Sequence, residues 1–258
     1  YVGTTDTDYK GSLDHVTATA DDVDYLLEVA NFTIPGRNLT RAHVVSTWAG
    51  LRPLIKPPGS VSTSKTSREH QIIPSPAGLL TITGGKLTTC RVMGQQVIDA
   101  AVKALGMTGV PASASHLHPL SGGDMGPDFH SRARATADSL RLSPAVTGRL
   151  TGRFGSNFFA VARHVEADPA AGQALGPHAV TRAEVRYAVL EEMARTLADF
   201  MDRRSALVYW TRDGGADIAE PVAAEMGRLL HWTETEQQRQ IAAYRDWVAA
   251  NRTAPVPG

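Results

Sequence analysis

The 258-residue sequence predicts an α+β protein in which a part that mixes strands and helices precedes an all-helical part. Residues 1–105 contain short β-prone runs separated by turn signals. From residue 128 onward, helix-capping residues and apolar stripes recur without a clear strand, which predicts a helical domain over 128–258. Residues 106–127 are rich in glycine, proline and serine and are predicted to link the two parts.

The composition is that of an ordinary globular protein, with 42% hydrophobic and 20% charged residues. The formal net charge of zero gives no bulk attraction to nucleic acid or to an anionic membrane. A single cysteine, Cys90, excludes an internal disulfide and a cysteine-cluster metal site. The chain starts without Met, as if inside a strand, so we expect a fragment of a longer protein.

The first fifty residues predict two β-prone segments with a helix between them. Residues 1–9 are interpreted as a strand and a turn, and residues 44–51 as a second β-rich segment that leads to Arg52. Between them, Thr19 and Asp22 have the spacing of a capping box, and the helix that follows carries an apolar stripe.

Residues 69–83 predict a β-hairpin. Two β-prone arms, 69–73 and 79–83, flank the turn-rich tip at 74–78. The second arm leads into Gly84-Gly85-Lys86, and a helix with one apolar face is predicted from about residue 90. Because a hairpin brings its two bases together, we expect Arg68 and Lys86 to be neighbours on the same side of the sheet.

The Gly-Gly-Lys turn is the clearest candidate for a ligand site. Two glycines allow a sharp turn and close approach to a ligand, and the following helix directs its free N–H groups and positive dipole end there. The turn does not fit the phosphate loop of nucleotide hydrolases, because Leu80 stands where a glycine is needed and Leu87 where Ser or Thr is needed. A left-handed turn with a solvated Lys86 is an equally good interpretation from these residues alone.

Three cations lie near this turn in the sequence: Arg52, Arg68 and Lys86. Arginine offers a planar fork for phosphate or carboxylate, and lysine offers a point charge. Together they suit a small anionic substrate, and the alternative is three solvated surface charges. The pair His116 and His118 has a spacing that could serve a metal, but a solvated loop is favoured and no metal site is predicted.

The helical part contains several start signals. Ser143-Pro144 and Asp168-Pro169 predict helix starts, and capping boxes begin at Thr181 and Thr233. The box at Thr181 is predicted to open the longest helix, which ends at Arg203-Arg204, with one apolar face formed by Val185, Val189, Met193, Leu197, Phe200 and Met201. Gly155 is expected to turn the chain, and Ser156 or Asn157 to cap the next helix.

Four motifs resemble the C-terminal part of the bacterial FAD-dependent glycerol-3-phosphate dehydrogenases, the aerobic, quinone-linked family within the flavoproteins that resemble D-amino-acid oxidase. In chain order they are Gly3-Thr4-Thr5-Asp6, Trp48-Ala49-Gly50-Leu51-Arg52-Pro53-Leu54, Gly84-Gly85-Lys86-Leu87-Thr88-Thr89, and Arg153-Phe154-Gly155-Ser156 together with residues 184–204. The third motif is the most specific, and the four cover nearly the whole chain. Cys90 departs from the family, which commonly has an aromatic residue there.

This resemblance implies a partial FAD-dependent oxidoreductase fold, in which residues 1–105 are the C-terminal part of the FAD- and substrate-binding region. It places the cofactor-binding residues Gly84, Gly85, Lys86, Leu87 and Thr88 beneath the flavin ring. It also implies that Arg52 and Lys86 are catalytic and bind the substrate phosphate, and that Arg68 is a further substrate-binding residue.

The implied reaction is oxidation of sn-glycerol 3-phosphate to dihydroxyacetone phosphate, with FAD as hydride acceptor and quinone as final acceptor. An oxidase that uses oxygen and a non-catalytic phosphate-binding module remain as alternatives. No Gly-x-Gly-x-x-Gly motif occurs, so the chain alone is expected to be inactive. The zero net charge predicts no nucleic-acid partner. The resemblance implies a cytoplasmic protein and is compatible with a homodimer and with peripheral contact at the inner face of the plasma membrane.

Overall fold

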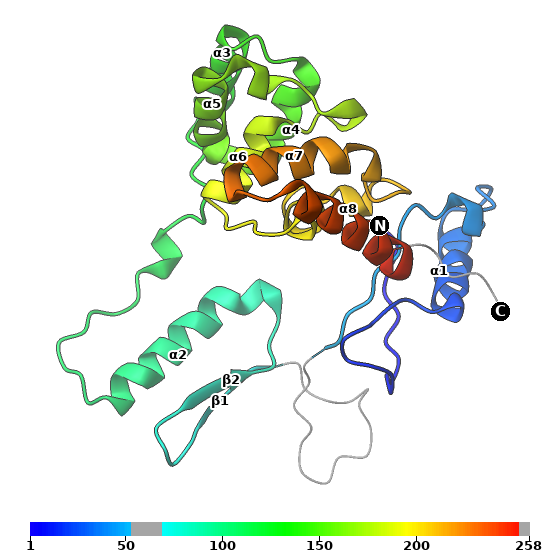
Figure 1. Cartoon of the computed structure of the whole chain (residues 1–258). Helices are drawn as coiled ribbons and strands as arrows, with labels where there is room; N and C mark the ends of the chain where they lie inside the picture. Colours follow the sequence, from blue (N-terminus) through cyan, green and yellow to red (C-terminus); the bar gives the residue numbers. More distant parts are fainter. Residues whose placement is uncertain (53–68, 253–258) are drawn as a thin grey trace. The chain divides into compact units, whose positions relative to one another are not determined.

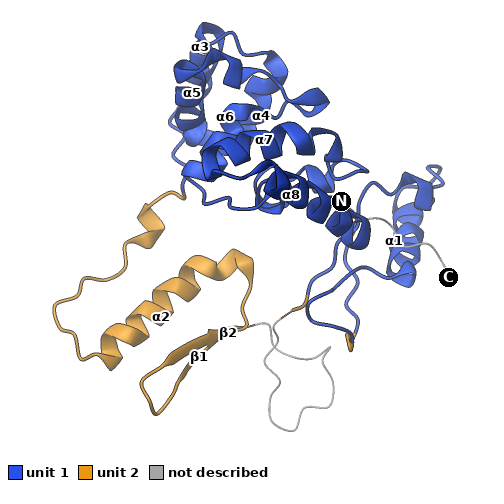
Figure 2. Ribbon diagram, in the orientation of Figure 1, with its two compact units in different colours: residues 1–7, 11–50, 121–258 blue, residues 8–10, 51–120 orange. Residues whose placement is uncertain are grey.

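The structure is a computed structural model that describes residues 1–52 and 69–252 (Figure 1). The helices are α1 (Ala20–Thr33), α2 (Cys90–Ala104), α3 (Phe129–Ser139), α4 (Pro144–Phe154), α5 (Phe158–Ala167), α6 (Arg182–Leu190), α7 (Ala219–Leu230) and α8 (Glu234–Asn251), and the strands are β1 (Gln71–Pro74) and β2 (Leu80–Thr83). The chain divides into two compact units, one formed by residues 1–7, 11–50 and 121–258 and the other by residues 8–10 and 51–120 (Figure 2). The predicted assignment of 1–105 to one region and 106–127 to a linker stays a prediction.

The smaller unit contains the predicted hairpin. β1 and β2 pair antiparallel, with Gln71 opposite Thr83 and Pro74 opposite Leu80. The Ser75 amide donates to the Leu79 carbonyl at 2.8 Å, and Gly78 takes a left-handed φ of 85°. Such a turn favours glycine, which has no Cβ to strain it. The hairpin is therefore confirmed, but its tip lies at 75–79 rather than 74–78, because Pro74 belongs to β1 and pairs with Leu80.

Neither of the other two predicted β segments forms a strand. In residues 1–9 and 44–51 the described backbone is irregular. A strand is stable only when a neighbouring strand satisfies its backbone groups, and neither segment pairs with another strand within the described residues. The Thr47 amide instead donates to the Arg252 carbonyl at 3.0 Å. These two segments therefore form no strand, although their residues favour β structure.

The part from residue 128 to residue 252 is helical, as predicted, with one isolated β-bridge between Ala174 and Thr181. Ser143, Thr181 and Thr233 each accept a hydrogen bond from the backbone amide three residues later, at 3.2–3.3 Å. Asp168 caps only a short 3-10 turn, Pro169–Gly172. The helices bury two hydrophobic clusters, whose fully buried members include Leu150, Phe158 and Val161 in one and Leu197, Phe200 and Met226 in the other.

The predicted longest helix is in fact two helical segments. α6 ends at Leu190, and the chain resumes as a short π-helix, Asp199–Arg204, after a turn in which Met193 is left-handed and 78% exposed. The Asp199 carboxylate accepts hydrogen bonds from the amides of Arg195 and Thr196, at 2.9 and 2.8 Å. These local bonds give the backbone an alternative to a continuous helix. The other apolar positions of the predicted face are buried as expected.

The motif around Gly155 holds the end of the linker. Gly155 has a φ of 52°, and a Cβ there would lie 2.0 Å from the Gly122 carbonyl oxygen. The Ser156 amide donates to that same carbonyl at 2.9 Å, and the Asn157 side chain donates to the Ser121 hydroxyl at 2.8 Å. The expected turn at Gly155 is confirmed, but the Asn157 side chain anchors the linker rather than capping α5.

Candidate functional site

The Gly-Gly-Lys turn joins β2 to α2. Gly84 and Gly85 have φ values of 74° and 95°, so both occupy the left-handed region that glycine tolerates best. Lys86 is extended, and its carbonyl accepts hydrogen bonds from the Thr89 amide at 3.0 Å and the Thr89 hydroxyl at 2.9 Å. A 3-10 turn, Leu87–Thr89, then leads directly into α2. The strand, glycine turn and helix start predicted from the sequence are all present.

The turn is packed between the base of the hairpin and the first turns of α2. A Cβ on Gly85 would lie 2.5 Å from the Met93 sulfur and 3.2 Å from the His70 Cβ. His70 reaches the same helix through a 2.5 Å hydrogen bond between its Nε2 and the Gln96 Oε1. The position of Gly85 therefore depends on both neighbouring elements, and a larger residue there cannot be accommodated without displacing Met93.

We expect Gly85→Ala to destabilise this turn by about 1–3 kcal/mol, because alanine is strained at a φ of 95°; the flexible end of Met93 must also move aside. The measurement is hydrogen exchange of the amides of residues 84–96 in the purified chain. The control is Gly94→Ala in α2, where a Cβ meets no atom within 4 Å and alanine favours the helix. Equal exchange in the two variants would contradict the prediction.

The structure describes two of the three predicted cations, Arg52 and Lys86. Lys86 is exposed directly after the two glycines, and Arg52 is exposed at the end of the first described range. Arg68 lies outside the described residues. The convergence of the three cations on one ligand therefore stays a prediction, as does the placement of Arg68 and Lys86 on one side of the sheet.

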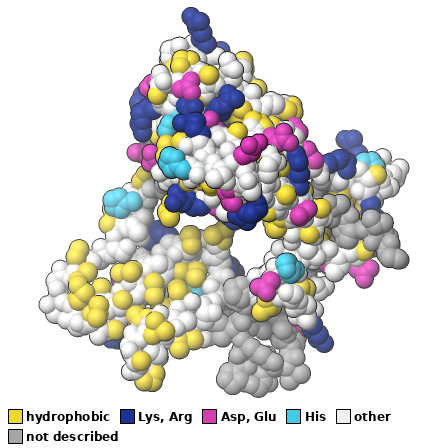
Figure 3. Space-filling model, in the orientation of Figure 1, with side chains coloured by type: hydrophobic (Ala, Val, Ile, Leu, Met, Phe, Trp, Pro, Cys, Tyr) yellow, Lys and Arg dark blue, Asp and Glu magenta, His cyan; other side chains and the backbone are white. Residues whose placement is uncertain are grey.

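Large apolar side chains are exposed around the turn and on α2. Leu79, Leu87 and Ile98 are 67%, 88% and 61% exposed, and Cys90 is also exposed. Figure 3 shows hydrophobic side chains gathered over the hairpin and α2. An exposed apolar patch of this kind marks a surface that binds a ligand or packs against other protein. The turn thus lies beside exposed apolar side chains of the smaller unit.

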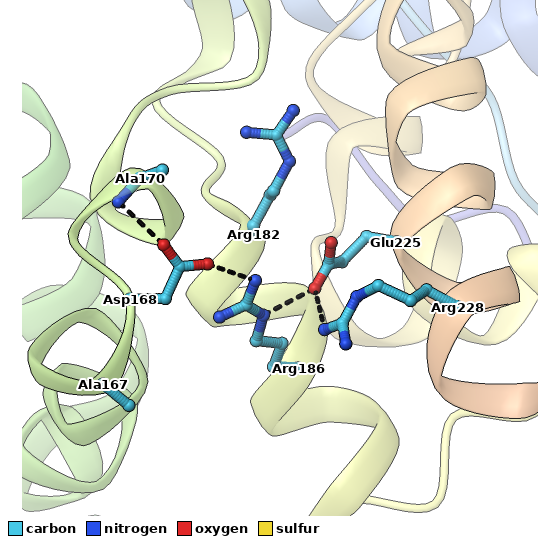
Figure 4. A pocket seen from close by; sticks show the side chains of 7 residues that line it. All are labelled: Ala167, Asp168, Ala170, Arg182, Arg186, Glu225 and Arg228. Carbon is cyan, nitrogen blue, oxygen red and sulfur yellow. Dashed lines mark hydrogen bonds and ion pairs between the residues drawn. The ribbon is translucent and has the colours of Figure 1, made fainter.

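A hollow of about 590 Å³ lies among the helices of the larger unit, and it is lined by Ala167, Asp168, Ala170, Arg182, Arg186, Glu225 and Arg228 (Figure 4). Arg186 donates to Asp168 at 2.7 Å and to Glu225 at 2.5 Å, and Arg228 donates to Glu225 at 2.7 Å. Burial alone would raise the pKa of Glu225, but these arginines more than offset it and hold its pKa below the ordinary value. Because carboxylates already pair with Arg186 and Arg228, we interpret this hollow as an ion-pair network that joins α6 to its neighbours.

Two further properties concern the part of the chain that the structure describes. Within it, no three histidine, cysteine or acidic side chains gather in a group that could hold a metal ion. None of its helices combines the length and the apolar character that crossing a membrane requires.

Comparison with known proteins connects both units to one kind of flavoprotein. The family model described as the C-terminal domain of alpha-glycerophosphate oxidase matches residues 113–237. The aerobic glycerol-3-phosphate dehydrogenase of Bacillus subtilis (strain 168) is 35% identical over 250 residues, which cover 93% of this chain and 44% of that protein. The enzyme of the same name from Staphylococcus haemolyticus is 33% identical, over 92% of this chain and 43% of its own length.

The solved structure of the glycerol-3-phosphate dehydrogenase from Bacillus halodurans, complexed with FAD, superposes with a TM-score of 0.79 at 30% identity. The match covers 96% of this chain and 48% of that one. The chain therefore spans less than half the length of these relatives. The predicted fold class, a partial fold of this kind followed by a helical domain, is confirmed by the similarity.

Proposed function

Because the chain belongs to the family of FAD-dependent aerobic glycerol-3-phosphate dehydrogenases, we propose that it forms the C-terminal part of such an enzyme. The reaction is oxidation of sn-glycerol 3-phosphate at C2 to dihydroxyacetone phosphate. The observation that carries the proposal is the Gly84–Thr89 turn, which precedes α2 in a chain similar to a dehydrogenase solved with FAD.

The turn suits the electron-rich edge of a flavin. The lack of side chains at Gly84 and Gly85 lets a flat ring approach the backbone, and the start of α2 favours negative charge nearby. When bound, FAD supplies the hydride acceptor. In this proposal, residues 84–88 hold the ring, Lys86 stabilises the negative charge that the ring gains, and Arg52, Arg68 and Lys86 bind the substrate's phosphate dianion.

The chain has no Gly-x-Gly-x-x-Gly motif for the FAD pyrophosphate. We therefore propose that residues outside this chain supply that site, and that the exposed apolar surface over the hairpin and α2 packs within the complete FAD region. The 258-residue chain alone would then lack dehydrogenase activity.

Quinone is the proposed final electron acceptor. We also propose that the enzyme is cytoplasmic, that it contacts the inner face of the plasma membrane, and that it is a homodimer. The word "aerobic" in the relatives' names supports a respiratory acceptor. The second candidate is an oxidase that passes electrons to oxygen, and the description of the matching family model favours it.

The test uses the purified full-length protein. The proposal expects a yellow protein whose flavin spectrum is bleached by glycerol 3-phosphate without oxygen. Recovery of the colour with a quinone, but only slowly with oxygen, supports the dehydrogenase, and rapid recovery with oxygen supports the oxidase. A colourless protein that still binds the phosphate ester would show a non-catalytic binding module.

A further inference from the structure

His70 lies beside the Gly-Gly-Lys turn but has no part of its own in the proposed reaction. We propose that His70 is a positioning residue, which holds the turn against α2 through its hydrogen bond with Gln96 and so sets how the turn meets the flavin. The inference rests on the proposed function, because it needs residues 84–88 to hold the ring. The residues that carry it all belong to the smaller unit.

The register of the hairpin places His70 next to the turn. Gln71 is opposite Thr83, the last residue of β2, so His70 and the turn lie at the same end of the hairpin. The His70 Cβ is 3.2 Å from the point that a Cβ on Gly85 would occupy, and the Met93 sulfur of α2 is 2.5 Å from the same point. The backbone of Gly85 therefore contacts both the hairpin base and α2, and Lys86 follows it directly.

One side-chain hydrogen bond joins the hairpin base to α2. The His70 Nε2 and the Gln96 Oε1 are 2.5 Å apart, and Gln96 lies in the second turn of the helix. The bond links the two ends of residues 70–96, the segment that contains the turn. Joining the ends of a segment reduces the number of conformations that the residues between them can adopt. The bond thus restricts the turn without touching the atoms that would face a ligand.

The first turn of α2 has a separate attachment that does not involve the hairpin. Arg91 donates from Nη1 to the Gln95 Oε1 at 3.0 Å and to the Ser115 hydroxyl at 3.1 Å. This contact holds the helix to the segment that follows it. Loss of the bond between His70 and Gln96 should therefore loosen the turn while α2 itself stays attached.

The position of the turn matters for the chemistry because the field of a helix end falls off within its first turn. In the proposed function, the start of α2 and the charge of Lys86 stabilise the negative charge that the flavin gains. A looser turn should stabilise this charge less well, so flavin reduction should be slower and the flavin potential lower. A contact that only supported the fold would instead change the melting temperature alone.

The first experiment measures hydrogen exchange of the Thr89 amide in the purified 258-residue chain, because this amide donates to the Lys86 carbonyl within the turn. Gln96→Met removes the acceptor at similar length and should speed this exchange about three- to tenfold, the range expected for one net hydrogen bond. Gln96→Glu keeps an acceptor oxygen and should exchange at the parental rate. The control is Gln95→Met on the same helix, since Gln95 accepts from Arg91 rather than from the hairpin. A parental rate in Gln96→Met, or an equal increase in Gln95→Met, would overturn the inference.

The second experiment measures flavin reduction by glycerol 3-phosphate in the full-length enzyme. His70→Ala and Gln96→Met should each slow it about three- to tenfold, and the second substitution should add nothing to the first. The same fold-change in the relative binding of reduced and oxidised flavin lowers the potential by on the order of 15–30 mV, since tenfold is about 30 mV for a two-electron couple. Gln96→Glu should keep the parental rate and potential.

A lower melting temperature with parental reduction rate and potential would show a contact that only supports the fold, and the inference would be wrong. If His70→Ala does not fold, the comparison of Gln96→Met with Gln96→Glu decides. Failure of the proposed function has a different sign, because glycerol 3-phosphate would then not bleach the flavin of the unsubstituted protein. In that case the exchange of the Thr89 amide still decides whether His70 holds the turn.

Discussion

Glu184→Ala should lower the free energy of unfolding by about 3–5 kcal/mol, the usual cost of removing one partner from a buried ion pair. Glu184 is 1% exposed, and its carboxylate accepts two hydrogen bonds from Arg149, at 3.0 Å from Nε and 2.6 Å from Nη2. Arg149 also donates to the Ser205 carbonyl at 3.2 Å. The pair joins α4 to α6, and the variant leaves a largely buried guanidinium without its carboxylate.

The measurement is denaturant unfolding of the purified chain. The control is Glu166→Ala on α5, an exposed glutamate, for which we expect a change within about 0.5 kcal/mol. Replacing both partners together, with Arg149→Met and Glu184→Leu, should recover much of the loss, because no unpaired charge stays buried. The prediction is wrong if Glu184→Ala and Glu166→Ala unfold at the same denaturant concentration.

The same carboxylate should make stability depend on pH. Burial raises the pKa of Glu184 above its ordinary value of 4.5, and Arg149 offsets only part of the rise. The folded state then binds more protons than the unfolded state between the ordinary and the raised pKa, so stability falls as pH rises through that window. Glu184→Gln, which cannot ionise, should flatten this part of the curve in unfolding experiments across pH. An unchanged slope would show that Glu184 does not titrate there.

Predictions from the sequence were confirmed where a turn or a helix cap depends only on neighbouring residues. The hairpin of β1 and β2, the left-handed Gly84 and Gly85, and the caps at Ser143 and Thr181 each depend on a few adjacent residues, so a short stretch of sequence is enough to predict them. The residues of the turn alone left its role open between a ligand site and a solvated loop, and the ligand site implied by the family resemblance stays a prediction.

Predictions from the sequence were wrong where the local structure depends on contacts with distant residues or on side-chain hydrogen bonds that compete with a helix. The segment 44–51 is β-prone, but its backbone contacts Arg212 and Arg252, more than 160 residues away, and no pattern within the segment indicates them. The break after Leu190 depends on one carboxylate, Asp199, that competes with an otherwise helical pattern. The Arg149–Glu184 pair was missed as well, because Glu184 had the appearance of an ordinary capping-box residue.

Lys86→Met in the full-length enzyme should lower kcat/KM by about one to two orders of magnitude, since a charge-assisted hydrogen bond to phosphate is worth roughly 1.5–3 kcal/mol. Arg52→Ala should have a similar effect but act mainly through KM, with the flavin potential nearly unchanged. Lys86 follows the glycine turn at the start of α2, so its charge is also expected to stabilise the anionic reduced flavin. Its loss should therefore lower kcat as well.

The second role of Lys86 is separated from the first by a redox titration. Losing a positive charge beside the reduced ring should move the flavin potential downward by on the order of 20–40 mV, since 30 mV corresponds to about 1.4 kcal/mol for a two-electron couple. The control is Lys103→Met in the last turn of α2, on the same helix but far along it from the turn, which should leave both kinetics and potential unchanged.

A downward shift in Lys86→Met alone would assign the charge to the flavin, whereas a rise in KM without a shift would assign it to the phosphate only. If Lys86→Met and Arg52→Ala both keep the parental kcat/KM and potential, these cations are surface charges and the assigned site is wrong.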